Sequence, residues 1–164
     1  MKTFTEQELK EILRKHKLWL EDSNQQDAER ADLSGANLSC ADLSCADLSR
    51  AKNIPFVPYA CPDFGSFIGY KKAQGLIVEL EILSDAKRVS ATGRKCRCDK
   101  AKVLSIQNID GTPSVKTSVA SDRDSEFIYK VGEIVTVDDF DENRWNECST
   151  GIHFFINRQE AVNY

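Results

Sequence analysis

Apolar side chains recur at three different spacings along this chain, and each spacing predicts a different element. Over residues 5–21 they recur three or four positions apart, which is typical of an amphipathic helix. Thr5 and Glu8 have the spacing of a capping box, so the helix is predicted to begin there. Over residues 76–83 two glutamates alternate with apolar residues, which indicates a β-strand. Between residues 31 and 51 the apolar residues recur every fifth position.

The period of five fits neither a helix nor a strand. Four units follow one another without a slip: Ala-Asp-Leu-Ser-Gly, Ala-Asn-Leu-Ser-Cys, Ala-Asp-Leu-Ser-Cys and Ala-Asp-Leu-Ser-Arg. Such self-similarity predicts stacked units that bury an apolar face together. The buried side chains are then the central leucines of the units, Leu33, Leu38, Leu43 and Leu48. The Asp, Asn and Ser side chains are expected to bond the backbone at the turns.

These units resemble the pentapeptide-repeat family, whose motif A(D/N)LXX each of them matches. The resemblance implies a right-handed, four-sided β-helix with one repeat on each side, so four repeats make about one coil. A single coil leaves its ends open, and the helix over residues 5–21 is expected to cover one of them. His16 lies on the apolar side of that helix and is predicted to be a packed structural residue. Residues 1–54 are therefore predicted to form one unit.

Residues 55–164 are predicted to form a second, β-rich unit of the α+β or mainly β class. Pro55, Pro58 and Pro62 break the repeat and indicate an irregular, extended connection. No internal repeat follows. Strands are predicted at 76–83, 102–106, 115–119, 127–130, 134–137 and 151–156, and a short helix at 158–163. They are expected to make a sheet of five or six strands with 151–156 near its centre.

The composition does not indicate a nucleic-acid or membrane partner. The 164 residues carry a formal net charge of −4, with 41% hydrophobic and 29% charged residues, which is ordinary for a globular protein. The sequence shows neither a signal-peptide core nor an apolar stretch of membrane-spanning length, so a cytoplasmic protein is expected. In that compartment the six cysteines are expected to be mostly reduced thiols.

Charge is concentrated in two segments of opposite sign. Residues 87–102 carry a net charge of +6, and residues 133–147 carry −5. Two solvated surfaces would explain this pattern. The alternative is an anion or phosphate site, because the forked guanidinium of arginine suits phosphate oxygens. Its predicted residues are Arg88, Arg94, Lys95 and Arg97.

Cysteine and histidine positions could suggest zinc, but their spacing argues against it. Cys96 and Cys98 are separated by a single residue, and Cys148 and His153 fit no standard zinc pattern. We therefore predict no metal, with free thiols as the simpler interpretation. No motif for a cofactor or catalytic residue is present, so neither is predicted.

His153 and Phe155 are predicted to share one face of the strand at 151–156, while Ile152, Phe154 and Ile156 share the other. A mixed face of imidazole and aromatic ring is typical of a pocket lining. The same pattern also fits a histidine that is hydrogen-bonded within a second core layer. Both interpretations stay open, and His153 and Phe155 join the four basic residues as the candidate ligand-binding set.

A second resemblance covers most of the chain. Residues 69–73, 95–98, 129–133 and 148–155 together resemble an uncharacterised domain found in tailed phages and large DNA viruses. That domain often follows a helix and pentapeptide repeats, and it implies a viral or prophage origin. Residues 129–133 and 151–161 also bear a looser likeness to ADP-ribosyltransferases.

The sequence therefore predicts a non-catalytic phage accessory protein that binds a host protein or a small, nucleotide-like anion. Two alternatives remain: an enzyme related to ADP-ribosyltransferases, and a structural or virion-associated protein. Self-association into a homo-oligomer is left open.

Overall fold

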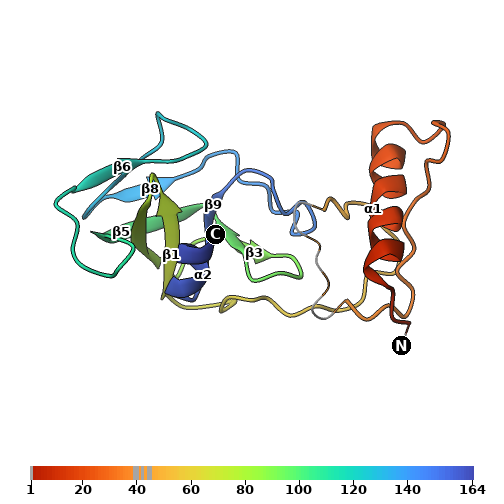
Figure 1. Ribbon diagram of the computed structural model, residues 1–164, viewed down its shortest axis with the longest axis horizontal. Coiled ribbons are helices and arrows are strands. Elements are labelled where there is room, and N and C mark those ends of the chain that lie inside the picture. The colour runs from red at the N-terminus through yellow and green to blue at the C-terminus, as the bar shows by residue number, and fades with distance from the viewer. Residues whose placement is uncertain (1, 39–40, 42, 44–45) are drawn as a thin grey trace.

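The computed structural model describes residues 2–38, 41, 43 and 46–164, and Figure 1 shows a lone helix at one end and a β-rich body at the other. The helix is α1 (Glu6–Glu21), and it begins as predicted at a capping box. The Glu8 amide donates to Thr5 Oγ1 at 3.2 Å, and the Thr5 amide donates to Glu8 Oε2 at 2.8 Å. These bonds satisfy amide groups that a helix otherwise leaves unpaired at its start.

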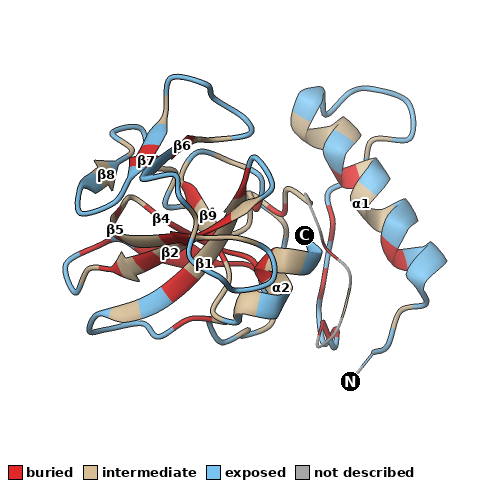
Figure 2. Ribbon diagram, turned by 60° about the vertical axis from the view of Figure 1, so that its left-hand side comes forward, coloured by how far each residue is buried: buried red, intermediate tan, exposed pale blue. Residues whose placement is uncertain are grey.

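The four repeat leucines point inward, as predicted, and none exposes more than 3% of its surface. They form one apolar cluster with Leu9 and with partly buried side chains of α1 such as Ile12 and Leu13. Figure 2 shows buried residues on the side of α1 that faces the repeats and exposed residues on its other side. Trp145, from the β-rich body, packs on the same cluster. The helix therefore packs on the repeat leucines, while its predicted role as the cover of a coil end stays a prediction.

Main-chain bonds tie the repeat segment to its own continuation. Asp32 and Lys52, four repeats apart, form a parallel bridge. The Leu33 amide donates to the Lys52 carbonyl at 2.9 Å, and the Lys52 amide donates to the Ala31 carbonyl at 2.8 Å. The predicted turn bonds occur where they are described, for example from the Ser34 amide to Asp32 Oδ1. The rest of the repeat prediction, at residues 39–40, 42 and 44–45, lies outside the described residues.

His16 joins α1 to both ends of the repeat segment. It is fully buried. Its Nδ1 accepts a bond from the Ala31 amide at 3.3 Å, so its Nε2–H donates to the Ser49 carbonyl at 3.0 Å. The imidazole is therefore neutral, and burial lowers its pKa. The prediction of a packed structural histidine is confirmed.

The β-rich body contains three antiparallel sheets rather than the single sheet that we predicted. One has the order β1-β2-β5-β8, the second β3-β4-β9, and β6 and β7 form a third. The strands are β1 (Phe67–Ala73), β2 (Leu76–Ile82), β3 (Arg88–Ser90), β4 (Cys96–Cys98), β5 (Lys100–Gln107), β6 (Ser118–Ala120), β7 (Ile128–Lys130), β8 (Ile134–Thr136) and β9 (Ile152–Phe154). The helix α2 (Arg158–Asn163) lies at the predicted position. The placement of 151–156 at a sheet centre was wrong, because β9 is an edge strand of its sheet.

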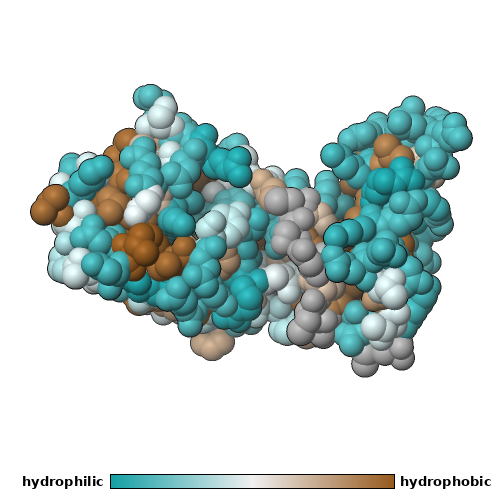
Figure 3. Space-filling model, in the orientation of Figure 1, coloured by the Kyte–Doolittle hydropathy of each residue, from teal (hydrophilic) through white to brown (hydrophobic). Residues whose placement is uncertain are grey.

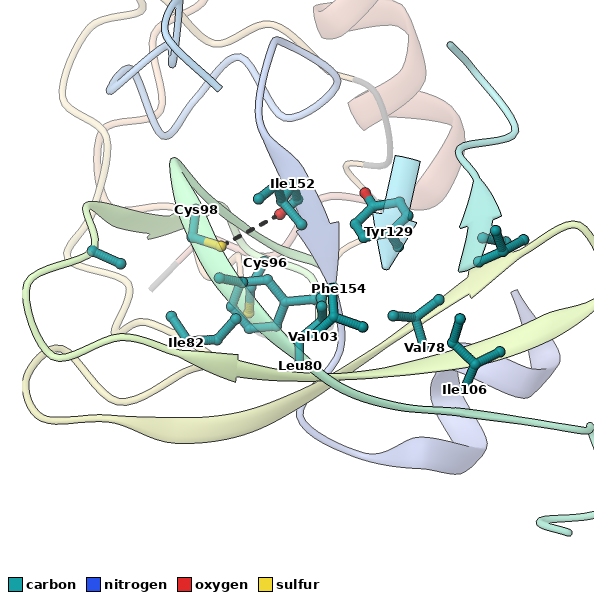
Figure 4. Close-up of a cluster of buried hydrophobic side chains, with 14 of the residues drawn as sticks. Val78, Leu80, Ile82, Cys96, Cys98, Val103, Ile106, Tyr129, Ile152 and Phe154 are labelled. Carbon is teal, nitrogen blue, oxygen red and sulfur yellow. Dashed lines mark hydrogen bonds between the residues drawn. The ribbon is translucent and has the colours of Figure 1, made fainter. Parts of the chain in front are cut away.

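The core of this body lies where the four-stranded and three-stranded sheets meet. Figure 4 shows Val78, Leu80 and Val103 on one side of it and Cys96 and Phe154 on the other. The Phe154 ring fits against Gly69 of β1, where an added Cβ would lie 2.7 Å from Phe154 Cδ2. The glycine thus allows β1 and β9 to approach each other. No helix in the described part of the chain is long and apolar enough to cross a membrane.

Candidate binding groove

Arg97, predicted as an anion ligand, lies in the middle of β4 and is almost fully buried. Its two terminal nitrogens donate to four main-chain carbonyls of the loop before β9, at 2.6–3.0 Å: those of Asp141, Asn143, Asn146 and Thr150. Gly151 is required beside it, since a Cβ there would lie 3.3 Å from Arg97 Cβ and the backbone φ is +143°. Arg97 therefore fixes the path of this loop.

Arg88 is engaged in the same way at the start of β3. It is buried, and its guanidinium lies over the ring of Phe67. It donates to four carbonyls at 2.7–3.1 Å: those of Gly65, Leu83, Ser84 and Ala86. A guanidinium has five N–H donors, so four such bonds leave little capacity for an anion.

Arg94 and Lys95 have different surroundings from these two arginines. The Arg94 side chain is mostly exposed and pairs with Glu160 of α2 at 2.8 Å. Lys95 is buried, with its ammonium 3.9 Å from Glu147 Oε2 and 3.6 Å from Cys148 Sγ. Of the four predicted basic residues, only Arg94 therefore reaches solvent to a large extent.

We predicted that His153 and Phe155 share one face of their strand. Both side chains are partly buried. His153 Nε2 lies 2.9 Å from the Ser149 carbonyl, and its cross-strand partner is Arg97. Burial is the main reason that its pKa is lowered to about 4, and the nearby Lys95 and Lys71 lower it further. Phe155 pairs with Tyr70 of β1 through two main-chain bonds. These contacts match the core-layer interpretation, while a ligand role for this pair stays a prediction.

Acid should destabilise the protein through its two histidines. Both folded pKa values lie below the value of about 6.5 in an unfolded chain, so the unfolded state binds more protons in between. Stability should be fully present at pH 7 and should fall as the pH drops below about 6.5, by about 2 kcal/mol from His153 alone at pH 5. Urea unfolding at both pH values measures this change. His153→Gln should flatten the dependence, and an equal slope in wild type and variant would contradict the assignment.

The two charged segments lie against each other rather than forming separate surfaces. Lys87 forms an ion pair with Glu142, and Lys95 lies near Glu147. The main contacts, however, are those of Arg97 with carbonyl groups. The sequence pattern therefore identified two segments that meet, but not the atoms through which they do so.

No group of three or more His, Cys, Asp or Glu side chains in the described residues could hold a metal ion. Cys61, Cys96 and Cys98 are free and buried, which agrees with the expectation of reduced thiols. Cys148 departs from that expectation, because it is disulfide-bonded.

Arg144, which the sequence analysis did not select, holds the connector between the repeats and β1. Its guanidinium donates to the Val57, Ser90 and Ala91 carbonyls at 2.7–2.9 Å. It also lies over the rings of Tyr59 and Trp145, 4.4 and 4.7 Å from their centroids. One residue of an acidic segment thereby links the connector, the β3 end and the repeat cluster. In the sequence, Arg144 is marked only by its place in an acidic segment, directly before Trp145.

A groove of about 600 Å³ opens beside this connector. Its walls come from residues 35–38 of the repeats, 55–60 of the connector and 92–94 of the loop between β3 and β4. Phe56 is 91% exposed and Tyr59 is 37% exposed, so two aromatic rings of the wall meet solvent. Arg94 adds a positive charge. Of the six predicted ligand-binding residues, only Arg94 lines this groove.

Two known families match this chain, and the boundary between the two matched ranges lies beside the groove. Residues 57–161 match a family of unknown function, DUF5758, over more than half of the chain. The chain belongs to this family. Residues 24–52 match the pentapeptide repeats, which confirms the repeat resemblance. No curated protein and no solved structure matches the chain.

The DUF5758 part and the repeats each contribute to the groove. Residues 35–38 lie within the repeat match, and residues 57–60 and 92–94 lie within the DUF5758 match. Pro55 and Phe56 fall between the two matches. The groove therefore requires both parts of this DUF5758 chain.

Proposed function

We propose that this DUF5758 protein is a non-catalytic binding protein whose groove receives an extended segment of a partner protein. The observation that carries the proposal is the connector wall, where Phe56 is 91% exposed. Figure 3 shows mostly hydrophilic residues over one face of the molecule, with brown apolar residues limited to small patches. A phenylalanine held open in a groove between two parts of a chain is typical of a contact that a partner covers.

The groove suits a peptide segment better than a nucleotide. Pro55 and Pro58 hold the connector extended, and they present Phe56 and Tyr59 on a wall without a charged side chain of its own. Phosphate recognition needs several free cations, but Arg88 and Arg97 donate to carbonyls elsewhere and Lys95 is buried beside Glu147. Only Arg94 is at hand in the groove. This arrangement favours the host-protein branch of the prediction over the small anion.

The repeat wall supports the same proposal. Since Asp32 bridges Lys52 four repeats later, we take the repeats as one coil of a right-handed, four-sided β-helix. Such a coil is a rigid support, because α1 packs on its leucines. A rigid wall lowers the entropy cost of binding an extended segment.

The residues that prompted the ADP-ribosyltransferase alternative do not come together around a common site. Tyr129 is buried in the β6–β7 sheet, and Glu133 pairs with Lys130 at the surface. His153 lies in a different sheet, on β9. No observation on the described residues favours an enzyme, so we propose the binding function alone.

A matched pair of phenylalanines tests the groove. Phe56 lines it, whereas Phe64 is also highly exposed, at 82%, and does not line it. The resemblance to a phage domain makes a bacterial cytosolic protein the first partner to seek. Affinity capture from bacterial lysate should yield a protein that wild type and Phe64→Ser retain and Phe56→Ser loses. Titration of that partner should show binding weakened by at least about 30-fold in Phe56→Ser, as for a central aromatic anchor.

Two results would contradict this proposal. A partner bound equally by Phe56→Ser and Phe64→Ser does not use the groove. A thermal-shift screen with nucleotides, NAD and cyclic dinucleotides tests the anion branch in parallel. A nucleotide that stabilises the protein, with no captured partner, would replace the protein-segment proposal.

A further inference from the structure

Two of the free thiols lie where the connector meets the core. Cys61 follows the connector residues that line the groove, and Cys96 opens β4. The Ala60 amide donates to Ser90 Oγ at 2.8 Å, and Ser90 is the cross-strand partner of Cys96. This bond holds the residue next to Cys61 against the strand pair that carries Cys96. Both cysteines belong to the same core cluster, and each side chain influences the pKa of the other.

The two thiols differ in pKa because their surroundings differ. The neighbouring Cys96 side chain is the largest cause that lowers the pKa of Cys61, and the positive charges of Arg88 and Arg144 lower it further. The pKa of Cys96 is raised by the neighbouring Cys61 side chain and by burial, and its thiol donates to the Arg94 carbonyl at 3.6 Å. Of the two thiols, Cys61 therefore loses its proton more readily than Cys96. Such a pairing of a thiolate with a neighbouring thiol is what peroxide-responsive cysteines use.

The three cysteines that are free among the described residues also differ in their exposure to solvent. Cys61 is 5% exposed, whereas Cys96 and Cys98 have no exposed surface. Cys98 lies on β4 with Cys96, and Figure 4 shows its sulfur directed to the Ile152 carbonyl, at 3.9 Å. An oxidant from solvent therefore meets Cys61 first, and Cys98 serves as the internal control.

We propose that Cys61 and Cys96 are a redox modification site, which a peroxide converts into a Cys61–Cys96 disulfide. The Cys61 thiolate attacks one peroxide oxygen, the O–O bond breaks, and hydroxide leaves, which gives a sulfenic acid. The Cys96 sulfur then attacks the Cys61 sulfur, the S–O bond breaks, and the departing hydroxide leaves as water with the Cys96 proton. Two electrons pass from the two sulfurs to the peroxide. A dithiol reductant reverses the reaction.

The disulfide would bind the end of the connector covalently to β4. The preceding residues, 57–60, line the groove, so oxidation would fix one wall against the β-rich body. This consequence rests on the proposed function, whereas the thiol chemistry does not.

Peptide mapping of the full chain tests the site directly. The protein is reduced, freed of reductant, treated with equimolar hydrogen peroxide, alkylated with iodoacetamide and digested. The expected product is a linked pair of peptides that contain Cys61 and Cys96, and dithiothreitol should remove it. Without peroxide, Cys61 should be alkylated at least about tenfold faster than Cys98. A link from Cys61 to Cys98, or a Cys61 that stays a thiol, overturns the proposal.

Two variants separate the steps. In Cys96→Ser the second step is blocked, so the sulfenic acid at Cys61 should persist and be trapped by dimedone. In Cys98→Ser the Cys61–Cys96 link should form as in wild type. Both results are read from the chain itself and need no binding partner. A mapped link without any change in partner binding would leave the thiol chemistry intact and remove only its connection to the groove.

Discussion

Arg97→Met should cost about 3–5 kcal/mol of folding free energy, which is a large share of the 5–15 kcal/mol typical of a whole domain. Methionine keeps the apolar stem but removes the donors for four partly buried carbonyl bonds of the loop before β9. Each carbonyl left without a partner pays a desolvation penalty. Urea unfolding at pH 7 measures the loss as a lower midpoint.

Arg94→Met is the matched control for this change. It removes an arginine three residues away whose side chain is 59% exposed and which pairs with Glu160. Exposed pairs contribute about 0–1 kcal/mol, so this variant should unfold near the wild-type midpoint. If both variants were equally stable, the four carbonyl bonds of Arg97 would not matter for the fold.

Leu43→Asp should unfold the repeat segment and release α1. Leu43 is 3% exposed within a cluster of leucines, so an aspartate there has no partner for its charge or its hydrogen bonds. Burial of such a group costs several kcal/mol. Limited proteolysis should cut between α1 and β1, and circular dichroism should show a loss of helix.

Leu43→Met supplies the control, because it keeps the volume and apolar character of the side chain. Swaps of this kind cost less than about 1.5 kcal/mol, so this variant should resist the protease as wild type does. Wild-type resistance in Leu43→Asp would mean that the repeat leucines do not hold this segment together.

The sequence predicted best those elements whose signals are local. The capping box at Thr5 and Glu8 fixes the start of α1 within a few residues, and the repeat motif marks each buried leucine by its phase. Residues 76–83 alternate clearly enough to identify β2. In these cases the residues that decide the structure are close together in the chain.

The elements that were missed depend on distant partners. β1 contains Gly69 and two lysines, a weak strand pattern, because the space at Gly69 is filled by Phe154 from β9. β3 and β4 carry Arg88 and Arg97, which in sequence look like solvent-facing charges. Only the three-dimensional structure brings carbonyl groups to these arginines, and so they are buried. A single sheet was predicted for the same reason, since strand partners are not encoded locally.

The sequence likewise predicted some parts of the candidate site and missed others. Proline spacing predicted the extended connector, and Arg94 was among the six residues selected. The sequence did not reveal the exposure of Phe56 and Tyr59, because this exposure follows from how the connector passes between two parts of the chain. The proposed thiol pair was also hidden, since Cys61 and Cys96 lie far apart in sequence.

Arg88, Arg97 and Arg144 bind main-chain oxygens rather than side chains, and this affects which positions of the chain can be exchanged. Arg97 and Arg144 hold the loop before β9 and the connector through carbonyl groups, which every amino acid possesses. Mutations in those segments can therefore exchange side chains without breaking the anchor. The exposed residues beside the groove should therefore tolerate substitution as long as Arg97 and Arg144 keep the backbone in place.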